Sequence, residues 1–192
     1  MGENNCRGCR KRKIEVQLGF MPRGLCRECF CNNVEKRIRK YIRLSCPLKK
    51  GDTLSVLDDR SLEAQVLLFA LKNLERDFPF KMRVIKRKPR NITRLVLPWN
   101  LDDTVVSFLK GVTLGTPQQK AIAPLSVVHS KEVRLFAKYR GLRSPSRDRI
   151  GKEGRIILRE LNKIEKNHPN VKFSVLNFSH SVKDQCYYRV GK

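Results

Sequence analysis

Apolar and polar positions follow two different periods along this chain, and the two periods predict strands and helices in alternation. Residues 80–85 alternate apolar with cationic side chains, the two-residue period of a strand that buries one face. Short apolar runs predict three further strands, at 53–57, 95–97 and 125–128. Because helical patterns separate these segments, the expected fold is α/β, with a parallel sheet covered by helices on both faces.

Apolar residues three or four positions apart predict five helices. The first runs from Glu28 to about Arg43 and places Phe30, Val34 and Ile38 on one face, with its cations mainly on the others. The remaining four are expected at 61–74, 101–111, 131–140 and 152–167, with Asn100 and Ser130 as N-caps of the second and third of these. The tail after Phe178 has no clear assignment.

Four cysteines near the start of the chain have the spacing of a metal site. Cys6 and Cys9 form one Cys-x-x-Cys pair, and after sixteen residues Cys26 and Cys29 form a second. Two such pairs are typical of a zinc ribbon, in which each pair turns two sulfurs toward one structural zinc ion. The alternatives are four ordinary thiols or two disulfides, but seven cysteines are an odd number, and the chain shows no apolar N-terminal signal segment. We therefore expect zinc and a cytoplasmic location.

The other three cysteines are expected to be inert, although Cys31 could take the place of Cys29 as a ligand. Cys46 and Cys186 have no partner at metal-ligand spacing. With the zinc segment defined, the chain divides into three expected parts. These are a zinc ribbon at 1–30, a basic linking helix at 31–50 and an α/β domain at 51–192.

The charge of the chain narrows the choice of partners. Forty-two Lys and Arg residues against 18 Asp and Glu give a formal net charge of +24, and the cations are clustered. No segment is apolar for long enough to cross a membrane, and we expect no membrane partner. Few aromatic residues are available for base stacking, so contacts with nucleic-acid phosphates are expected. The expected contact residues are Arg37, Arg39, Lys40, Arg43, Lys86, Arg87 and Lys88.

Several landmarks, taken in order, resemble one family. They are Leu25-Cys26-x-x-Cys29-Phe30, Gly51-Asp52-Thr53-Leu54, Asn100-Leu101-Asp102-Asp103, Pro124-Leu125, Lys131-Glu132-Val133 and Leu161-Asn162-x-Ile164-Glu165. This order is similar to that of the PP-loop (adenine nucleotide alpha hydrolase-like) ATP pyrophosphatases that put sulfur into tRNA uridines. The resemblance covers nearly the whole chain. It implies a PP-loop α/β domain behind the zinc ribbon, with tRNA as the nucleic acid.

The loop that should bind ATP departs from the family pattern. In that family the first strand leads into Ser-Gly-Gly-x-Asp-Ser, whose glycines let backbone N–H groups surround the pyrophosphate. Matched on Leu67-Leu68, the loop here reads Asp59, Arg60, Ser61, Leu62, Glu63 and Ala64, and no glycine lies between Asp52 and Lys110 in any register. A like charge about 4 Å from a phosphate costs on the order of 4 kcal/mol at an effective dielectric constant near 20. We expect no ATP to bind.

The sulfur-handling thiols of catalytic relatives are also missing. Their Cys-x-x-Cys before the Asn-Leu-Asp-Asp motif is replaced by the basic stretch 86–94, and their later Cys-Pro is Ser144-Pro145. Gly-His before the same motif is Pro98-Trp99, and the two acids of the motif suit the first turn of a helix better than a magnesium site. The three histidines have no ligand or catalytic partner at a suitable spacing.

These losses resemble a pseudoenzyme member of the family. The resemblance implies a non-catalytic subunit needed for 2-thiolation of wobble uridine in cytoplasmic tRNAs. It would form a heterodimer with a catalytic PP-loop paralogue, which takes sulfur from a thiocarboxylated ubiquitin-like carrier. Two alternatives stay open at this point: an active ATP-dependent tRNA sulfurtransferase, and a free-standing zinc-ribbon RNA-binding protein.

Overall fold

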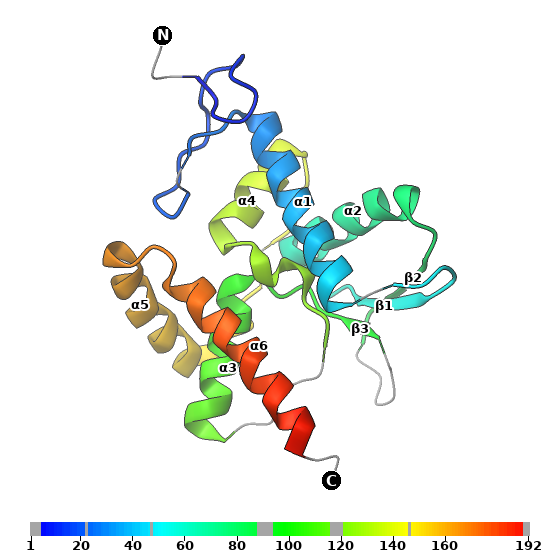
Figure 1. The fold of residues 1–192 in the computed structure, drawn as a ribbon, viewed down its shortest axis with the longest axis vertical. Helices are drawn as coiled ribbons and strands as arrows, with labels where there is room; N and C mark the ends of the chain where they lie inside the picture. Colours follow the sequence, from blue (N-terminus) through cyan, green and yellow to red (C-terminus); the bar gives the residue numbers. More distant parts are fainter. Residues whose placement is uncertain are drawn as a thin grey trace.

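The computed structural model describes residues 5–21, 23–46, 48–87, 94–115, 121–145 and 147–189, with side chains described as far as residue 182. Its helices and strands alternate behind an irregular N-terminal segment (Figure 1). In order they are α1 (Arg27–Ser45), β1 (Thr53–Leu57), α2 (Leu62–Asp77), β2 (Lys81–Ile85), β3 (Leu95–Val96), α3 (Leu101–Leu114), the 3-10 helix η1 (Pro124–Val127), α4 (Ser130–Tyr139), α5 (Gly151–Asn167) and α6 (Val171–Arg189).

The three strands form a parallel sheet with β1 in the middle, in the order β2-β1-β3. Thr53 pairs with Lys81 along one side of β1, and Ser55 pairs with Leu95 along the other. Parallel neighbours require crossover connections, and α2 supplies the one between β1 and β2. The expected α/β class with a parallel sheet is confirmed. The carboxyl ends of β1 and β3 lie side by side, and the loops that follow them meet there.

The strand expected at 125–128 was wrong. Pro124 begins the short 3-10 helix η1, because its fixed backbone angle suits the first turn of a helix and it has no N–H for a strand ladder. The parallel contact with β3 comes from Ile122, whose N–H donates to Leu95 O at 2.9 Å. Of the tail left unassigned by the sequence, residues 179–189 belong to α6.

Helix starts follow the expected chemistry, with one shift. Ser61 caps α2 by accepting a hydrogen bond from Ala64 N at 3.1 Å, and Asn100 and Asp103 form a reciprocal capping box at the start of α3. The N-cap of α4 is His129 and not Ser130, one residue earlier than expected, because Glu132 reaches back to His129 N at 2.9 Å. None of the described helices is long and apolar enough to cross a membrane.

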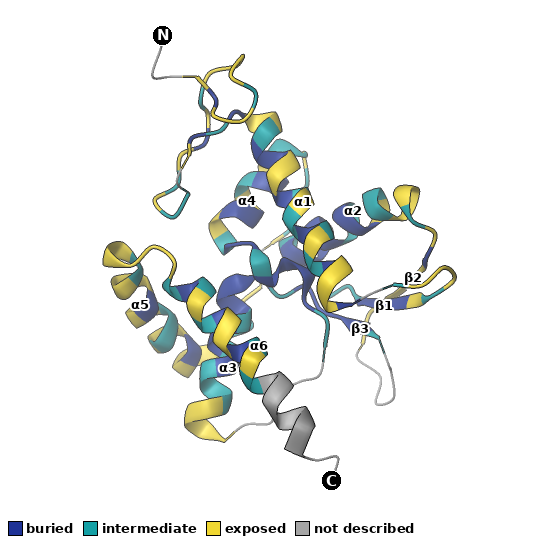
Figure 2. Ribbon diagram, viewed as in Figure 1, coloured by how far each residue is buried: buried dark blue, intermediate teal, exposed yellow. Residues whose placement is uncertain are grey.

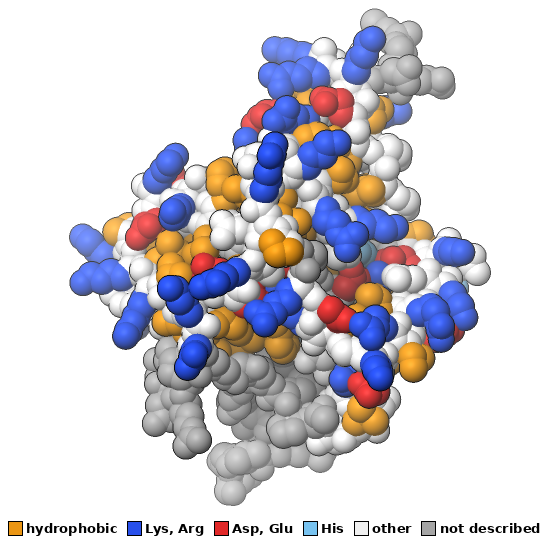
Figure 3. Space-filling model, turned by 180° about the vertical axis from the view of Figure 1, so that it is seen from behind, with side chains coloured by type: hydrophobic (Ala, Val, Ile, Leu, Met, Phe, Trp, Pro, Cys, Tyr) orange, Lys and Arg blue, Asp and Glu red, His pale blue; other side chains and the backbone are white. Residues whose placement is uncertain are grey.

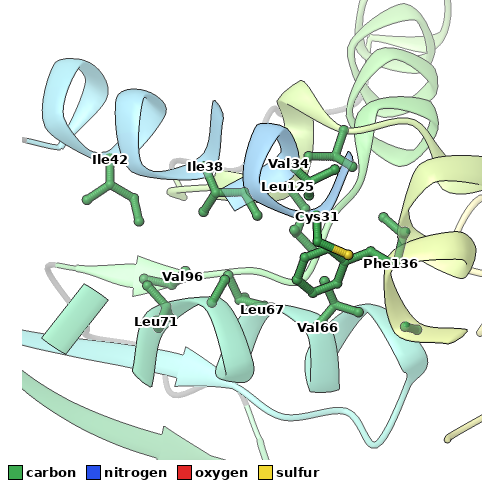
Figure 4. Close-up of a cluster of buried hydrophobic side chains, with 14 of the residues drawn as sticks. Cys31, Val34, Ile38, Ile42, Val66, Leu67, Leu71, Val96, Leu125 and Phe136 are labelled. Atoms are coloured by element: carbon green, nitrogen blue, oxygen red, sulfur yellow. The ribbon is translucent and has the colours of Figure 1, made fainter. Parts of the chain in front are cut away.

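Buried apolar residues form two clusters. The larger one joins the sheet to α1, α2, η1 and α4, and Figure 4 shows Ile38 and Ile42 of α1 facing Leu67 and Leu71 of α2 with Val96 between them. The smaller cluster joins α3, α5 and α6. Helix α1 therefore presents one face to the main core and the other to solvent (Figure 2). The division at 1–30, 31–50 and 51–192 stays a prediction, although α1 shares its core with the α/β domain.

Candidate metal centre and degenerate nucleotide loop

The four predicted cysteines come together at one point. The sulfurs of Cys6, Cys9, Cys26 and Cys29 all lie within 4.8 Å of one another, and Cys9 Sγ is 3.9 Å from Cys26 Sγ. Tetrahedral zinc with bonds of about 2.3 Å separates its thiolates by about 3.8 Å, whereas a disulfide holds its sulfurs at about 2.05 Å. The cysteines are free thiols. The donor set thus fits a zinc ribbon.

Local backbone geometry builds this site from both pairs. Arg10, just after the first pair, adopts a left-handed conformation (φ 60°), and its N–H donates to Cys6 O at 2.8 Å, which turns the chain back on itself. Gly8 has no side chain because a Cβ atom there would lie 2.9 Å from Cys29 Sγ. Cys26 is the N-cap of α1, and Cys29 lies in its first turn, where the helix dipole favours thiolates.

The thiols oppose one another's ionisation unless a cation lies among them. Burial and the neighbouring sulfurs of Cys26, Cys6 and Cys9 raise the pKa of Cys29 to about 12. For Cys6, burial is outweighed by hydrogen bonds from backbone N–H groups, which lower the pKa to about 6. A divalent ion bound by all four sulfurs removes this conflict because it supplies the missing positive charge.

The ribbon packs on its own chain. Phe20 at the ribbon tip stacks on His129 with ring centroids 3.7 Å apart, and Val16 belongs to the main core. Arg27 donates to Tyr139 O and lies over the Tyr139 ring at 5.3 Å from its centroid. The metal centre is therefore attached to the α/β domain through α4.

The loop between β1 and α2 closes on itself. Arg60 has a positive φ of 62°, and the side chains of Asp58 and Asp59 accept hydrogen bonds from Arg60 N (2.9 Å) and Ser61 N (3.2 Å). Leu62 N donates to Pro145 O at 3.1 Å, and Ala64 N donates to Ser61 Oγ. In a phosphate-binding loop these amides would be free to meet the anion. Here Ser61, Leu62 and Ala64 already use theirs.

A guanidinium group lies in front of the same helix start. Arg149 binds one oxygen of Asp59 through two nitrogens, Nε at 3.0 Å and Nη2 at 2.7 Å, and also donates to Ser61 Oγ. Its Nη1 is 3.2 Å from Glu63 and 3.6 Å from Asp103. The Arg149 side chain is only 11% exposed, and Glu63 only 3%. These four charged residues, which we term the Arg149 cluster, lie at the N-terminus of α2.

The two acids of the Asn-Leu-Asp-Asp motif are both used inside the protein. Burial raises the pKa of Asp103 to about 7, although Arg149 partly opposes the shift. Asp102 pairs with Lys172 of α6 at 2.7 Å, and that ion pair keeps the pKa of Asp102 low despite its burial. Lys172 also contacts Glu165 at 3.0 Å. These contacts join α3 to α5 and α6, so the motif serves the fold.

The positions at which the sequence departs from the catalytic pattern converge on this loop. Ser144 Oγ donates to Arg60 O, and Pro145 accepts from Leu62, so the segment that replaces Cys-Pro lies directly on the degenerate loop. Trp99, which replaces the histidine, lines a cavity of about 270 Å³ together with Asp103 and Arg149. The loop, the motif and the Ser-Pro segment therefore form one region of the structure.

The cations predicted to contact RNA phosphates differ in their surroundings. Arg37 forms an ion pair with the buried Glu132 and donates to Val127 O at 3.1 Å, so it has a structural contact. Arg39 pairs with the exposed Asp77. The fully exposed members are Lys40, Arg43, Lys86 and Arg87, and Lys88 lies outside the described residues. Figure 3 shows cations spread over the face seen from behind, from the ribbon downward.

The sequence did not predict the two cations, Arg149 and Lys172, that pair with the acids of the loop and of the Asn-Leu-Asp-Asp motif. Arg149 and Lys172 lie 90 and 70 positions beyond their partners Asp59 and Asp102, so periodicity and spacing carry no signal for either pair.

Comparison with known proteins supports the fold. The sequence matches no protein-family model and no curated protein. Among solved structures, the chain is similar to the U34-tRNA thiolase NcsA from Methanococcus maripaludis with its 4Fe-4S cluster. The TM-score is 0.75 at 16% sequence identity, over 95% of this chain and 88% of that chain. The chain thus shares the α/β fold of that thiolase, and its four-cysteine cluster fits a zinc ribbon.

Proposed function

We propose that this chain is the non-catalytic subunit needed for 2-thiolation of wobble uridine in cytoplasmic tRNAs, the role of cytoplasmic tRNA 2-thiolation protein 2. Support for a role in tRNA thiolation comes from the fold it shares with a U34-tRNA thiolase over 95% of its length. A catalytic PP-loop paralogue, supplied with sulfur by a thiocarboxylated ubiquitin-like carrier, is the proposed partner.

The observation that carries the non-catalytic assignment is the Arg149 cluster. A bound ATP phosphate would have to displace Arg149 and leave the buried Glu63 without its counter-charge. It would also have to compete with Asp59, Pro145 and Ser61 for the amides of the loop. An unpaired buried charge costs several kcal/mol, so the loop favours its own internal contacts over a nucleotide.

We propose zinc as the metal of the ribbon. Sulfurs within 4.8 Å of one another surround a single ion, whereas a four-iron cube separates its ligands because each sulfur binds a different iron. The part assigned to zinc is structural: it would hold the ribbon in the fold that places Phe20 on His129 and presents the ribbon cations. Five of these cations, Arg7, Arg10, Lys11, Arg12 and Lys13, are exposed.

Contacts with tRNA phosphates are proposed for exposed cations, with Lys86 and Arg87 after β2 as the members least involved in other contacts. Such contacts position RNA without reading its sequence and make binding steeply dependent on salt. If Lys86→Glu together with Arg87→Glu leaves both the affinity and its salt dependence unchanged, this part of the proposal is wrong.

The test of the function is the level of 2-thiouridine in bulk tRNA after depletion of the protein, read as retarded migration on a mercury gel. Loss of the retarded band, with rescue by the intact gene but not by Cys26→Ser, is the expected result. An unchanged band would remove the protein from thiolation. An ATP titration into the millimolar range addresses the catalytic alternative: we expect no saturable binding, and binding abolished by Asp59→Lys would overturn the non-catalytic assignment.

A further inference from the structure

A groove with a volume of about 460 Å³ lies between the C-terminal halves of α1 and α2, away from the metal centre and the Arg149 cluster. Its floor is apolar and consists of Ile42, Leu48, Leu74 and Phe78. Grooves of this size, lined mainly by apolar side chains, are typical of binding sites. The other lining residues are all cations, so the groove combines an apolar floor with positive charge.

These cations form a single stripe along α1. Lys36, Arg39, Lys40 and Arg43 follow the spacing i, i+3, i+4, i+7, which places them on one helix face over about 10 Å. Three of the four are exposed, and the fourth, Arg39, makes an ion pair with Asp77 in which both side chains are well exposed (40% and 54%). Ion pairs of that kind contribute little, so Arg39 is free to exchange its partner.

From this groove we infer a docking site for an acidic amphipathic helix of a partner protein. Apolar side chains of the helix would cover the floor, and its Asp or Glu side chains would meet the cationic stripe. A helix that binds in an apolar groove anchors itself through side chains at positions i, i+3, i+4 and i+7, which lie on one of its faces. The charge complementarity sets the orientation of the helix and the rate of association.

The lining residues favour a protein segment over RNA. Their side chains carry hydrogen-bond donors but no acceptor, and the floor carries neither. The N–H donors of an unpaired base would therefore lose their partners on entering the groove, whereas apolar side chains need none. This inference does not depend on the proposed function, and it competes with the sequence-based prediction that Arg39, Lys40 and Arg43 contact tRNA.

The test uses the full-length protein and a labelled synthetic helix of about 16 residues, with Leu every third or fourth position on one face and Glu on both flanks. The comparison probes are a shuffled peptide of the same composition and an anticodon stem-loop RNA. Fluorescence anisotropy is expected to show saturable binding of the patterned peptide, at least about tenfold tighter than the shuffled one. Equal binding of the two peptides would overturn the inference, because net charge alone would then explain it.

Variants of the lining residues show whether the peptide binds in the groove. Lys40→Glu together with Arg43→Glu is expected to weaken peptide binding about tenfold, and Leu74→Gln should do the same without a change of charge. Arg134→Glu together with Lys138→Glu, two exposed cations on α4, changes the charge equally and should leave binding within about twofold. If the α4 variant is equally weak, or if the groove variants lose only the stem-loop RNA, the groove is not the proposed docking site.

The molecule that occupies the groove in cells can be identified by placing a photo-crosslinking residue at position 40 instead of Lys40. The expected adduct is a protein segment in which mass spectrometry finds apolar residues every third or fourth position with acidic residues between them. An adduct with RNA, or the absence of any adduct, would contradict the inference. The mercury-gel measurement is independent of this result, so each proposal can fail without the other.

Discussion

The ribbon and the loop between β1 and α2 each bring ionisable groups of one kind close together. They differ in the source of the opposite charge. The ribbon brings the sulfurs of four cysteines within 4.8 Å of one another. The loop region brings Asp59, Glu63 and Asp103 together around Arg149, which belongs to the same chain. The four cysteines have the geometry to hold a metal ion from solution, whereas the carboxylates of the loop already have a cation of their own chain.

The difference lies in what the start of each helix meets. A helix start attracts an anion only while its amides and its electrostatic field are free. At α2 the amides are used locally, and the nearest charges are carboxylates neutralised from within. At α1 the helix start meets Cys26 and Cys29, and burial together with the neighbouring sulfurs raises the pKa of Cys29 to about 12. Four changes, taken from the largest expected effect to the smallest, would break or sharpen the comparison.

Removing a metal ligand should have the largest effect. Cys26→Ser is expected to abolish stoichiometric zinc binding and unfold the ribbon, because structural zinc contributes on the order of 10 kcal/mol to folding such segments. Metal analysis of the purified protein and proteolysis of the ribbon measure the two effects. Cys46→Ser is the control: it changes a buried thiol outside the cluster and should keep one zinc per chain. Full zinc content in Cys26→Ser would contradict the four-ligand assignment.

Removing the internal cation should come next. Arg149→Met leaves three buried or half-buried carboxyl groups without their partner, and the free energy of unfolding should fall by about 3–5 kcal/mol. The loss should be smaller near pH 5 than near pH 8, because protonated carboxyl groups need no counter-charge. Denaturant unfolding at both pH values measures it. Arg147→Met, which loses only an exposed hydrogen bond to Asp59 O, should cost less than about 1 kcal/mol.

The pH dependence of stability should reveal Asp103. Its pKa rises from 3.8 to about 7 on folding, so the folded state binds the proton more tightly. The free energy of unfolding therefore falls as the pH rises from about 4 to about 7. Asp103→Asn should remove this fall and stabilise the protein near pH 8 by on the order of 2 kcal/mol, since the amide oxygen can still accept from Asn100 N. Asp77→Asn, an exposed control, should keep the wild-type slope; an unchanged slope in Asp103→Asn would refute the assignment.

The smallest effect is expected at the contact between the ribbon and the domain. Phe20→Ala removes the ring stacked on His129 and should cost about 1 kcal/mol beyond the lost apolar burial. Burial lowers the pKa of His129 to about 4, so uncovering the ring should move its pKa back toward 6.5. An NMR titration of His129 measures the shift, with Gln17→Ala as an exposed control. A pKa that stays near 4 would show that Phe20 does not cover the histidine.

Local signals predicted much of the fold. The alternation at 80–85 and the apolar run at 53–57 predicted β2 and β1, and the helix start expected at Ser61 and the cap expected at Asn100 placed the starts of α2 and α3 within a residue. The expected strand at 125–128 failed because Pro124 turned an apolar run into a 3-10 helix. Helix α6 was missed because its sequence shows no clear apolar stripe.

The metal centre was predictable because its four cysteines occur as two Cys-x-x-Cys pairs, a spacing that is visible in the sequence. The tRNA contacts stay a prediction, and the structure separates them into paired residues such as Arg37 and exposed ones such as Lys86.

What the sequence determined by itself is therefore local: strand and helix periods, capping residues, the cysteine pairs, and the loss of glycines between Asp52 and Lys110. The tertiary structure alone decided which cations pair with the buried acids, because Arg149 and Lys172 meet their carboxylates only after the chain has folded across 70 to 90 residues. Charge pairing over such separations depends on packing and desolvation, which act through space and leave no period in the sequence.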